Sequence, residues 1–292
     1  MTEENKTDLE FIEIYPKIVV YKNIFKDIEK TYSVLKESAQ NNEDRFFSEW
    51  TQWSKFGEYL NPVVLNHPHK LDYDNVSSIE TKTETEGLQK ELLLEVLKGF
   101  NDVTKHYTQH FGVEIEEEVY VKDDQENDIP LWQWVGPSIA KYKDEIVDMV
   151  AMSYHSDYIW EPIVSPGYKF AITALAYFND DYEGGEIDFV IDKDLYKYKP
   201  EAGDYLVFPS GHPEILTKEG MVYLHGVLPP IGPNKYLSRM YWMKYTKGAP
   251  EWYEKEKEFG KEVWASMQPE IMENFRLTHP NRNEILDGVR IK

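Results

Sequence analysis

The stretch Tyr154-His155-Ser156-Asp157 places an imidazole and a carboxylate two residues apart near the middle of the chain. Residues two apart on an extended strand point to the same side, so both groups can face one bound ion. A second imidazole, His225, follows much later in Leu224-His225-Gly226. Two imidazoles and one carboxylate that leave positions open suit Fe(II) better than a closed structural zinc site. We therefore predict a metal site formed by His155, Asp157 and His225.

The residue pattern after Asp157 is typical of an antiparallel β structure. Short apolar runs alternate with turns such as Gly184-Gly185 and Pro200 to Asp204. The predicted strands cover residues 168–179, 186–191, 205–208, 222–227 and 235–245. Short strands at this spacing, separated by Gly, Pro and Asp turns, predict a sandwich or jelly roll. The nearly continuous apolar run at 168–179 predicts a strand buried on both faces.

The sequence before this region mixes strands and helices. Two short strands are predicted at 11–15 and 18–21, a helix at 24–38, an irregular loop at 39–86, a helix at 88–111, and strands at 113–120, 132–134, 139–143 and 147–154. The helix at 88–111 has a broad apolar stripe and a glycine, Gly112, placed to end it. After residue 246, a charged amphipathic pattern predicts a helical extension over 247–292.

Composition narrows the function classes. The 292 residues carry a net charge of −21, and no Lys/Arg cluster offsets it, which argues against nucleic-acid and anionic membrane partners. Cysteine is absent, so disulfides and thiolate sites are excluded. No leader-like start and no apolar run of membrane-spanning length is present, which favours a cytoplasmic protein.

The order of these motifs resembles the Fe(II)/2-oxoglutarate-dependent dioxygenases, and within them the prolyl-4-hydroxylase-like branch. His155-x-Asp157, the Gly184-Gly185 turn, His225 and then a basic residue follow one another as in that family. The resemblance implies a mainly β fold with flanking α-helices, a double-stranded β-helix or jelly roll. It implies one catalytic domain over 1–292, with strands and supporting helices at 9–112, the core at 113–246 and the extension at 247–292.

The resemblance also implies the cofactors and their residues. Fe(II) is held by His155, Asp157 and His225, and the reaction uses 2-oxoglutarate and O2, with ascorbate as a support. Lys235, ten residues after His225, is expected to pair with the far carboxylate of 2-oxoglutarate, since an unpaired buried charge is costly. Arg239 is either the alternative anchor or a second cation near the 1-carboxylate of 2-oxoglutarate or the substrate. The family pattern further assigns Tyr177, Thr173 and Tyr142 to the 2-oxoglutarate pocket.

The expected activity is hydroxylation of an unactivated C–H bond, with a prolyl residue of a peptide or protein as the leading substrate. A free amino acid or another small metabolite is the alternative substrate. Two other possibilities stay open: a jelly-roll metalloprotein that works without 2-oxoglutarate, and a binding module without enzymatic activity. Lys235 and Arg239 separate a 2-oxoglutarate enzyme from the metalloprotein, because only the former needs these cations, and the metal content of the pure protein separates the binding module. Oligomeric state is not predicted.

Overall fold

The computed structural model describes most of the chain from residue 9 to residue 246. The described residues are 9–38, 47, 50–54, 57–60, 73–116, 118–123, 125–143, 152–155, 157, 167–191, 194–210, 223–227 and 229–246. The predicted helical extension at 247–292 lies outside them. No helix among the described residues is both long and apolar enough to cross a membrane. The cytoplasmic location stays a prediction.

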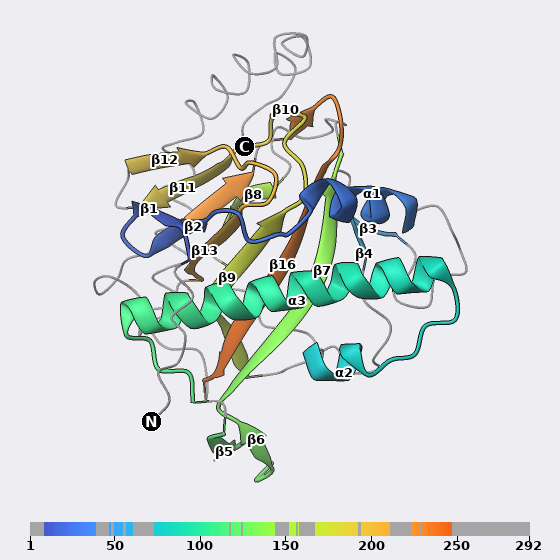
Figure 1. The fold of residues 1–292 in the computed structure, drawn as a ribbon. Helices are drawn as coiled ribbons and strands as arrows, with labels where there is room; N and C mark the ends of the chain where they lie inside the picture. The colour runs from blue at the N-terminus through green and yellow to red at the C-terminus, as the bar shows by residue number, and fades with distance from the viewer. Residues whose placement is uncertain are drawn as a thin grey trace.

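Two antiparallel sheets and three helices form the described fold (Figure 1). The 8-stranded sheet has the spatial order β1 (Phe11–Tyr15), β2 (Ile18–Tyr21), β13 (Tyr205–Pro209), β9 (Tyr168–Tyr177), β16 (Lys235–Tyr245), β7 (Trp132–Tyr142), β4 (Gly57–Leu60) and β3 (Thr51–Ser54). The 4-stranded sheet has the order β12 (Asp194–Tyr198), β11 (Ile187–Ile191), β14 (Leu224–Val227) and β8 (Met152–His155). Two short pairs join β10 (Glu183–Gly184) to β15 (Pro230–Ile231) and β5 (Tyr120–Lys122) to β6 (Asp128–Pro130).

Alternating side chains divide the large sheet into two apolar faces. Successive strand residues point to opposite sides. On β2, Val19 belongs to the core that α3 covers, and Val20 belongs to a second core. On β9, Ala176 and Tyr177 divide in the same way. The second core also contains Ile187, Phe189 and Ile191 of β11, so the small sheet packs on the face of the large sheet opposite α3.

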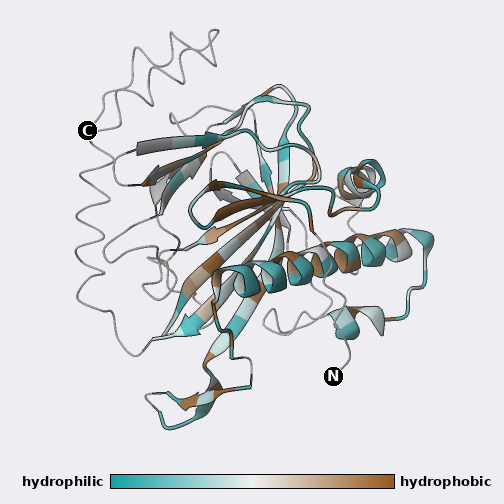
Figure 2. Ribbon diagram, turned by 60° about the vertical axis from the view of Figure 1, so that its left-hand side comes forward, coloured by the Kyte–Doolittle hydropathy of each residue, from teal (hydrophilic) through white to brown (hydrophobic). Residues whose placement is uncertain are grey.

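Helix α3 (Glu84–Phe111) lies across the large sheet, with α1 (Ile28–Ser38) beside it and α2 (Tyr73–Ser77) near its start (Figure 1). The Thr83 side chain caps its N-terminus by accepting from the backbone N–H of Glu86. Gly112 ends it in the left-handed conformation, as the sequence predicts. Gly99 lets the helix approach β13 closely, because a Cβ there would lie 2.2 Å from the Tyr205 hydroxyl. Hydrophilic residues line the outward side of α3 (Figure 2).

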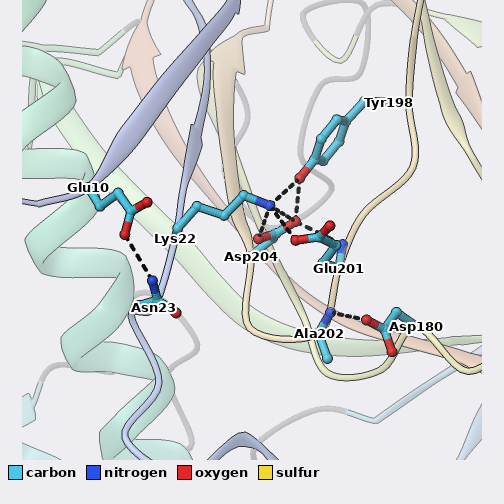
Figure 3. Close-up of polar contacts among 8 residues, drawn as sticks. All are labelled: Glu10, Lys22, Asn23, Asp180, Tyr198, Glu201, Ala202 and Asp204. Atoms are coloured by element: carbon cyan, nitrogen blue, oxygen red, sulfur yellow. Dashed lines mark hydrogen bonds and ion pairs between the residues drawn. The ribbon is translucent and has the colours of Figure 1, made fainter.

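A buried ion pair fixes the turn that leads into β13 (Figure 3). The Lys22 Nζ lies 2.8 Å from Asp204 Oδ1 and 2.8 Å from Glu201 Oε2. Asp204 is 2% exposed, and it also accepts from the Tyr198 hydroxyl and from the backbone N–H of Glu201. The backbone of the same turn pairs with Tyr177 on β9, since the Gly203 N–H donates to the Tyr177 carbonyl at 2.8 Å. The ion pair therefore joins β2, the turn and β9.

The structure confirms most predicted elements and corrects several. The strands at 11–15, 18–21 and 235–245 are confirmed. The strand predicted at 113–120 is wrong, because residues 113–116 have no regular structure and β5 begins only at Tyr120. The first helix begins at Ile28 and not at residue 24, and α3 begins earlier than predicted, at Glu84. Residues 39–86 contain β3, β4 and α2, and β12 was not predicted.

Within the described residues, the N-terminal segments at 9–112 pack together with the strands of 113–246. Strands β1 and β2 pair directly into the large sheet beside β13. Apolar residues of α3, such as Val96 and Phe100, share one core with Ala174 of β9. The N-terminal segments are thus part of the same packed unit as the strands that carry the predicted site.

Replacing Lys22 with methionine should destabilise the protein by about 2 kcal/mol, because Asp204 would stay buried without its cation. The measurement is urea unfolding followed by intrinsic fluorescence. Lys30→Met is the matched control: the Lys30–Glu91 pair has the same 2.8 Å distance, but its side chains are 53% and 66% exposed. That control should lose far less stability than Lys22→Met, because solvent screens an exposed ion pair. Equal losses in the two variants would contradict this account of the turn.

Candidate functional site

Strand pairing brings the predicted metal ligands together. In the small sheet, β14 pairs with β8 so that the Cα of His225 lies opposite the Cα of His155. Asp157 follows two residues after His155 and is 5% exposed. The side chain of His155 lies outside what the structure describes, so the side-chain geometry concerns His225 and Asp157. Among the described side chains, no group of three or more metal-ligating residues is found.

His225 and Asp157 face each other in a dry environment. The His225 Nε2 lies 3.6 Å from Asp157 Oδ2, and His225 is 4% exposed. The rings of Phe208 and Phe189 cover the imidazole, with ring centroids 4.9 and 6.0 Å away. The His225 Nδ1 lies 3.3 Å from the Tyr223 carbonyl, which can only accept a hydrogen bond. Nδ1 is therefore the donor there.

This arrangement fits a metal ion. With its proton on Nδ1, neutral His225 presents an Nε2 lone pair toward a carboxylate that is also an acceptor. Two buried acceptors that face each other are stabilised by a cation or a proton between them. Donor atoms held about 2.1 Å from one ion lie roughly 3 to 4 Å apart, the range in which this pair falls.

A chain of hydroxyl groups orients the Asp157 carboxylate. The Thr173 hydroxyl on β9 donates to Asp157 Oδ2 at 2.6 Å. Thr173 Oγ1 also lies 2.6 Å from the Ser210 hydroxyl, just after β13, which becomes the donor because the Thr173 proton is already used. The family resemblance assigned Thr173 to the 2-oxoglutarate pocket, whereas its described side-chain contacts are with Asp157 and Ser210. Its predicted contact with 2-oxoglutarate stays a prediction.

Lys235 lies on the same face of the large sheet, at the other end of the second core. It is 0% exposed, and its Nζ donates to the Gly185 carbonyl at 2.5 Å. The rings of Tyr177 and Tyr142 stand 5.1 and 5.9 Å from Nζ. Burial lowers the pKa of Lys235 to about 7, with a smaller contribution from the nearby Lys199 ammonium. A buried ammonium of this kind is stabilised by an anion.

The Gly184-Gly185 turn shapes the Lys235 environment. Both glycines have positive φ, 62° and 69°, a conformation that L side chains rarely adopt. A Cβ on Gly185 would lie 2.7 Å from the Tyr182 ring and 3.5 Å from Lys235 Cδ. Glycine is therefore needed at position 185 both for the backbone conformation and for the close approach of the Tyr182 ring.

Arg239 and Tyr142 lie between the Lys235 end and the Asp157 end of the second core. Arg239 follows Lys235 by four residues on β16, and its Nε donates to the Ser138 hydroxyl at 3.0 Å. Burial is the main cause that raises the pKa of Tyr142 to about 12. The nearby Arg239 cation lowers this pKa and the Asp157 carboxylate raises it, so Tyr142 lies within electrostatic reach of both groups. Lys235, Tyr177 and Tyr142 thus form one group, while Arg239 lies toward the Asp157 end.

Sequence reasoning missed Ser210 and Tyr182. Ser210 follows two residues after the predicted strand at 205–208, but only the fold shows that its hydroxyl reaches Thr173. Tyr182 stands two residues before Gly184, and its ring lies 5.8 Å from Lys235 Nζ. The proximity of Tyr182 to the glycine turn was the available signal, although an aromatic residue there also suits plain packing.

No family model and no curated protein matches the sequence. Among solved structures, a viral collagen prolyl hydroxylase from Paramecium bursaria Chlorella virus-1, in a 2-oxoglutarate complex, is 14% identical, with a TM-score of 0.44 over 79% of this chain and 97% of that chain. Dioxygenase for auxin oxidation 1 from Arabidopsis thaliana, in a 2-oxoglutarate complex, is 10% identical, with a TM-score of 0.49 over 80% and 86%.

A prolyl hydroxylase from Trichoplax adhaerens, in complex with a hypoxia inducible factor peptide fragment, is 12% identical, with a TM-score of 0.42 over 83% of this chain and 86% of that chain.

Thr173→Val should weaken Mn(II) binding about 10- to 100-fold, because the Asp157 carboxylate loses the donor that orients it. Electron paramagnetic resonance of free Mn(II) gives the dissociation constant. Thr31→Val is a matched control, since the buried Thr31 hydroxyl donates to the Glu95 carboxylate at 2.7 Å, far from this site. An unchanged Mn(II) affinity in Thr173→Val would contradict the proposed orienting contact.

Lys235→Met should change how stability depends on pH. In the folded protein the Lys235 pKa is about 7, well below the ordinary value of 10.5, so between these pH values the unfolded chain binds a proton that the folded protein lacks. The cost of burying Lys235 is therefore full below pH 7 and shrinks as the pH rises toward 10.5.

The stability advantage of Lys235→Met over the wild-type protein should therefore fall by roughly 3 kcal/mol between pH 7 and pH 10. Urea unfolding at both pH values measures it. A stability difference that does not change with pH would show that Lys235 keeps its ordinary pKa in the folded protein.

Proposed function

We propose that this protein is an Fe(II)- and 2-oxoglutarate-dependent oxygenase on a double-stranded β-helix. One observation carries the proposal: a buried histidine–carboxylate pair and a buried lysine occupy opposite ends of a single apolar core. Tyr177, at the Lys235 end, and Thr173, at the Asp157 end, are four residues apart on β9, roughly 13 Å along the strand. Leu237 and Leu175, which belong to the same buried core, lie along the strands between these ends.

The arrangement suits a ligand with a metal-binding group at one end and a carboxylate at the other. In this proposal His155, Asp157 and His225 hold Fe(II). Lys235 and the Tyr177 hydroxyl bind the far carboxylate of 2-oxoglutarate. The Tyr177 hydroxyl is buried and has no hydrogen-bond partner within the part of the chain that the structure describes, so it is available as a donor. Lys235 is favoured over Arg239 as the anchor, because Arg239 lies toward the Asp157 end.

When bound, Fe(II) supplies activation of O2, so that 2-oxoglutarate, O2 and a substrate C–H group give succinate, CO2 and the hydroxylated product. The protein's own residues position and shield these reactants. Thr173 and Ser210 keep the Asp157 carboxylate in one orientation. Phe208 and Phe189 keep water from the imidazole of His225. Lys235 neutralises a carboxylate that would otherwise be buried without a partner.

We propose a prolyl residue of a peptide or protein as the substrate. The motif order that resembles prolyl 4-hydroxylases supports this choice. Phe170 and Tyr241 also support it: they stack with ring centroids 4.2 Å apart, and Tyr241 pairs with Thr173 across the strands, so an aromatic surface lies on the Asp157 side. Such a surface suits an apolar ring. A free amino acid is the competing substrate class, and the net charge of −21 disfavours nucleic acid.

The test is succinate formation from 2-oxoglutarate with Fe(II), ascorbate and O2, first without any added substrate. The wild-type protein should turn over slowly, and His225→Ala should lose at least about 100-fold, since one ligand of three is removed. His106→Ala is the control, because His106 lies on α3 and hydrogen-bonds Tyr21 on the opposite face of the sheet.

Absence of succinate with wild-type protein, together with no binding of 2-oxoglutarate, would overturn the proposed activity. The same assay with added substrates separates the substrate classes. Proline-containing peptides should stimulate succinate formation and gain one oxygen by mass spectrometry, whereas stimulation by free amino acids alone would replace the prolyl proposal.

A further inference from the structure

Tyr182 is held in place by contacts that leave its hydroxyl unused. The side chain is 4% exposed and stands immediately before β10. The Lys199 Nζ lies 3.6 Å from the centre of its ring and donates to the Tyr182 and Gly184 carbonyls at 2.8 and 2.6 Å. The Tyr182 ring also packs on Gly185, where a Cβ would come within 2.7 Å. Ring and backbone are therefore both fixed.

The hydroxyl of Tyr182 is buried without a hydrogen-bond partner among the described residues. Tyr177 shares this property, and both rings lie within 5.8 Å of the Lys235 ammonium. A buried hydroxyl that makes no hydrogen bond costs about 1–3 kcal/mol, so native proteins contain few of them. Both rings lie beside the buried Lys235 cation, and an anion bound next to it would supply the acceptor that the two hydroxyls lack.

We infer that the Tyr182 hydroxyl donates a hydrogen bond to the far carboxylate of the bound 2-oxo acid, as a third donor beside Lys235 and Tyr177. A carboxylate can accept several hydrogen bonds on its two oxygens, so three donors can be satisfied at once. Tyr182 then helps the site to select a dicarboxylic 2-oxo acid over one that ends in a methyl group. The inference rests on the proposed function and adds a specificity-determining residue to it.

Packing alone does not explain tyrosine at this position. The contacts that Lys199 and Gly185 make with Tyr182 involve its ring and its carbonyl, and phenylalanine would provide the same ring and carbonyl. Among the described residues, the hydroxyl adds only a desolvation cost until a ligand accepts a hydrogen bond from it. Tyr182→Phe therefore removes the proposed donor and leaves the described packing contacts in place.

The experiment is isothermal titration calorimetry of 2-oxoglutarate into the full-length protein loaded with Mn(II), which avoids turnover. Tyr182→Phe should raise the dissociation constant of 2-oxoglutarate about tenfold, since a hydrogen bond to a charged acceptor is lost. Tyr107→Phe is the matched control, because the buried Tyr107 hydroxyl on α3 donates to the Lys17 carbonyl at 2.8 Å. Its dissociation constant should stay within about twofold of the wild-type value.

A second ligand separates donation from packing. 2-Oxopentanoate has the same chain length but a methyl group in place of the far carboxylate, so Tyr182→Phe should leave its affinity unchanged. A loss of affinity for both ligands by the same factor would assign Tyr182 a packing role and overturn the inference. Without ligand, Tyr182→Phe should unfold at a temperature no lower than the wild-type protein, because only an unpartnered hydroxyl is lost.

The two proposals fail in different ways. Wild-type affinity for 2-oxoglutarate in Tyr182→Phe would overturn the role of Tyr182 and leave the proposed function intact. Lack of 2-oxoglutarate binding by the Mn(II)-loaded wild-type protein would overturn the proposed function, and the role of Tyr182 with it.

Discussion

The alternation of side chains along the central strands is the constraint on which the rest of the structure depends. Each residue of β9 or β16 that points away from α3 enters the space between the two sheets. A shift of one residue in register would exchange Thr173 and Tyr177 for neighbours that now pack under α3. The predicted metal ligands and the Lys235 group can share one core only because these registers are fixed.

The core that they share carries polar groups that lower stability in the absence of a ligand. Lys235 is wholly buried with a depressed pKa, and the Tyr177 and Tyr182 hydroxyls have no hydrogen-bond partner among the described residues. Apolar residues at these positions would make a more stable core. By contrast, the polar groups of the turn at Asp204 are fully paired with one another. Two buried hydroxyls without a partner beside Lys235 are expected of a proposed binding site, whereas the fully paired groups at Asp204 are expected of a structural network.

Sequence patterns predicted those parts of the fold that are determined locally. The β16 run, the Gly112 helix end and the glycine turn each have a local physical cause, and each was predicted at its observed place. The strand predicted at 113–120 was wrong because, among the described strands, none pairs with its alternating Val, Ile and Glu residues before Tyr120. Strand β12 was missed because it is short and charged, so its composition gives a weak strand signal. Its antiparallel pairing with β11 makes it a strand.

The structure brings the predicted ligands His225 and Asp157 within 3.6 Å of each other, and their role as metal ligands stays a prediction. These residues were predicted from chemistry and spacing, and Tyr142 was assigned to the 2-oxoglutarate pocket from the resemblance. The Thr173–Asp157 contact, the Ser210 hydroxyl and the unused hydroxyl of Tyr182 depend on distances between strands far apart in the chain. Sequence spacing does not encode these distances, and only the assembled sheets define them.

The most direct measurement of the central claim is a crystal structure of the protein with Mn(II) and 2-oxoglutarate. This account predicts one metal ion bound by His155, Asp157 and His225, with the far carboxylate of 2-oxoglutarate hydrogen-bonded to Lys235 and Tyr177. A metal ion bound elsewhere, or a far carboxylate bound by Arg239 with Lys235 left on the Gly185 carbonyl alone, would contradict it.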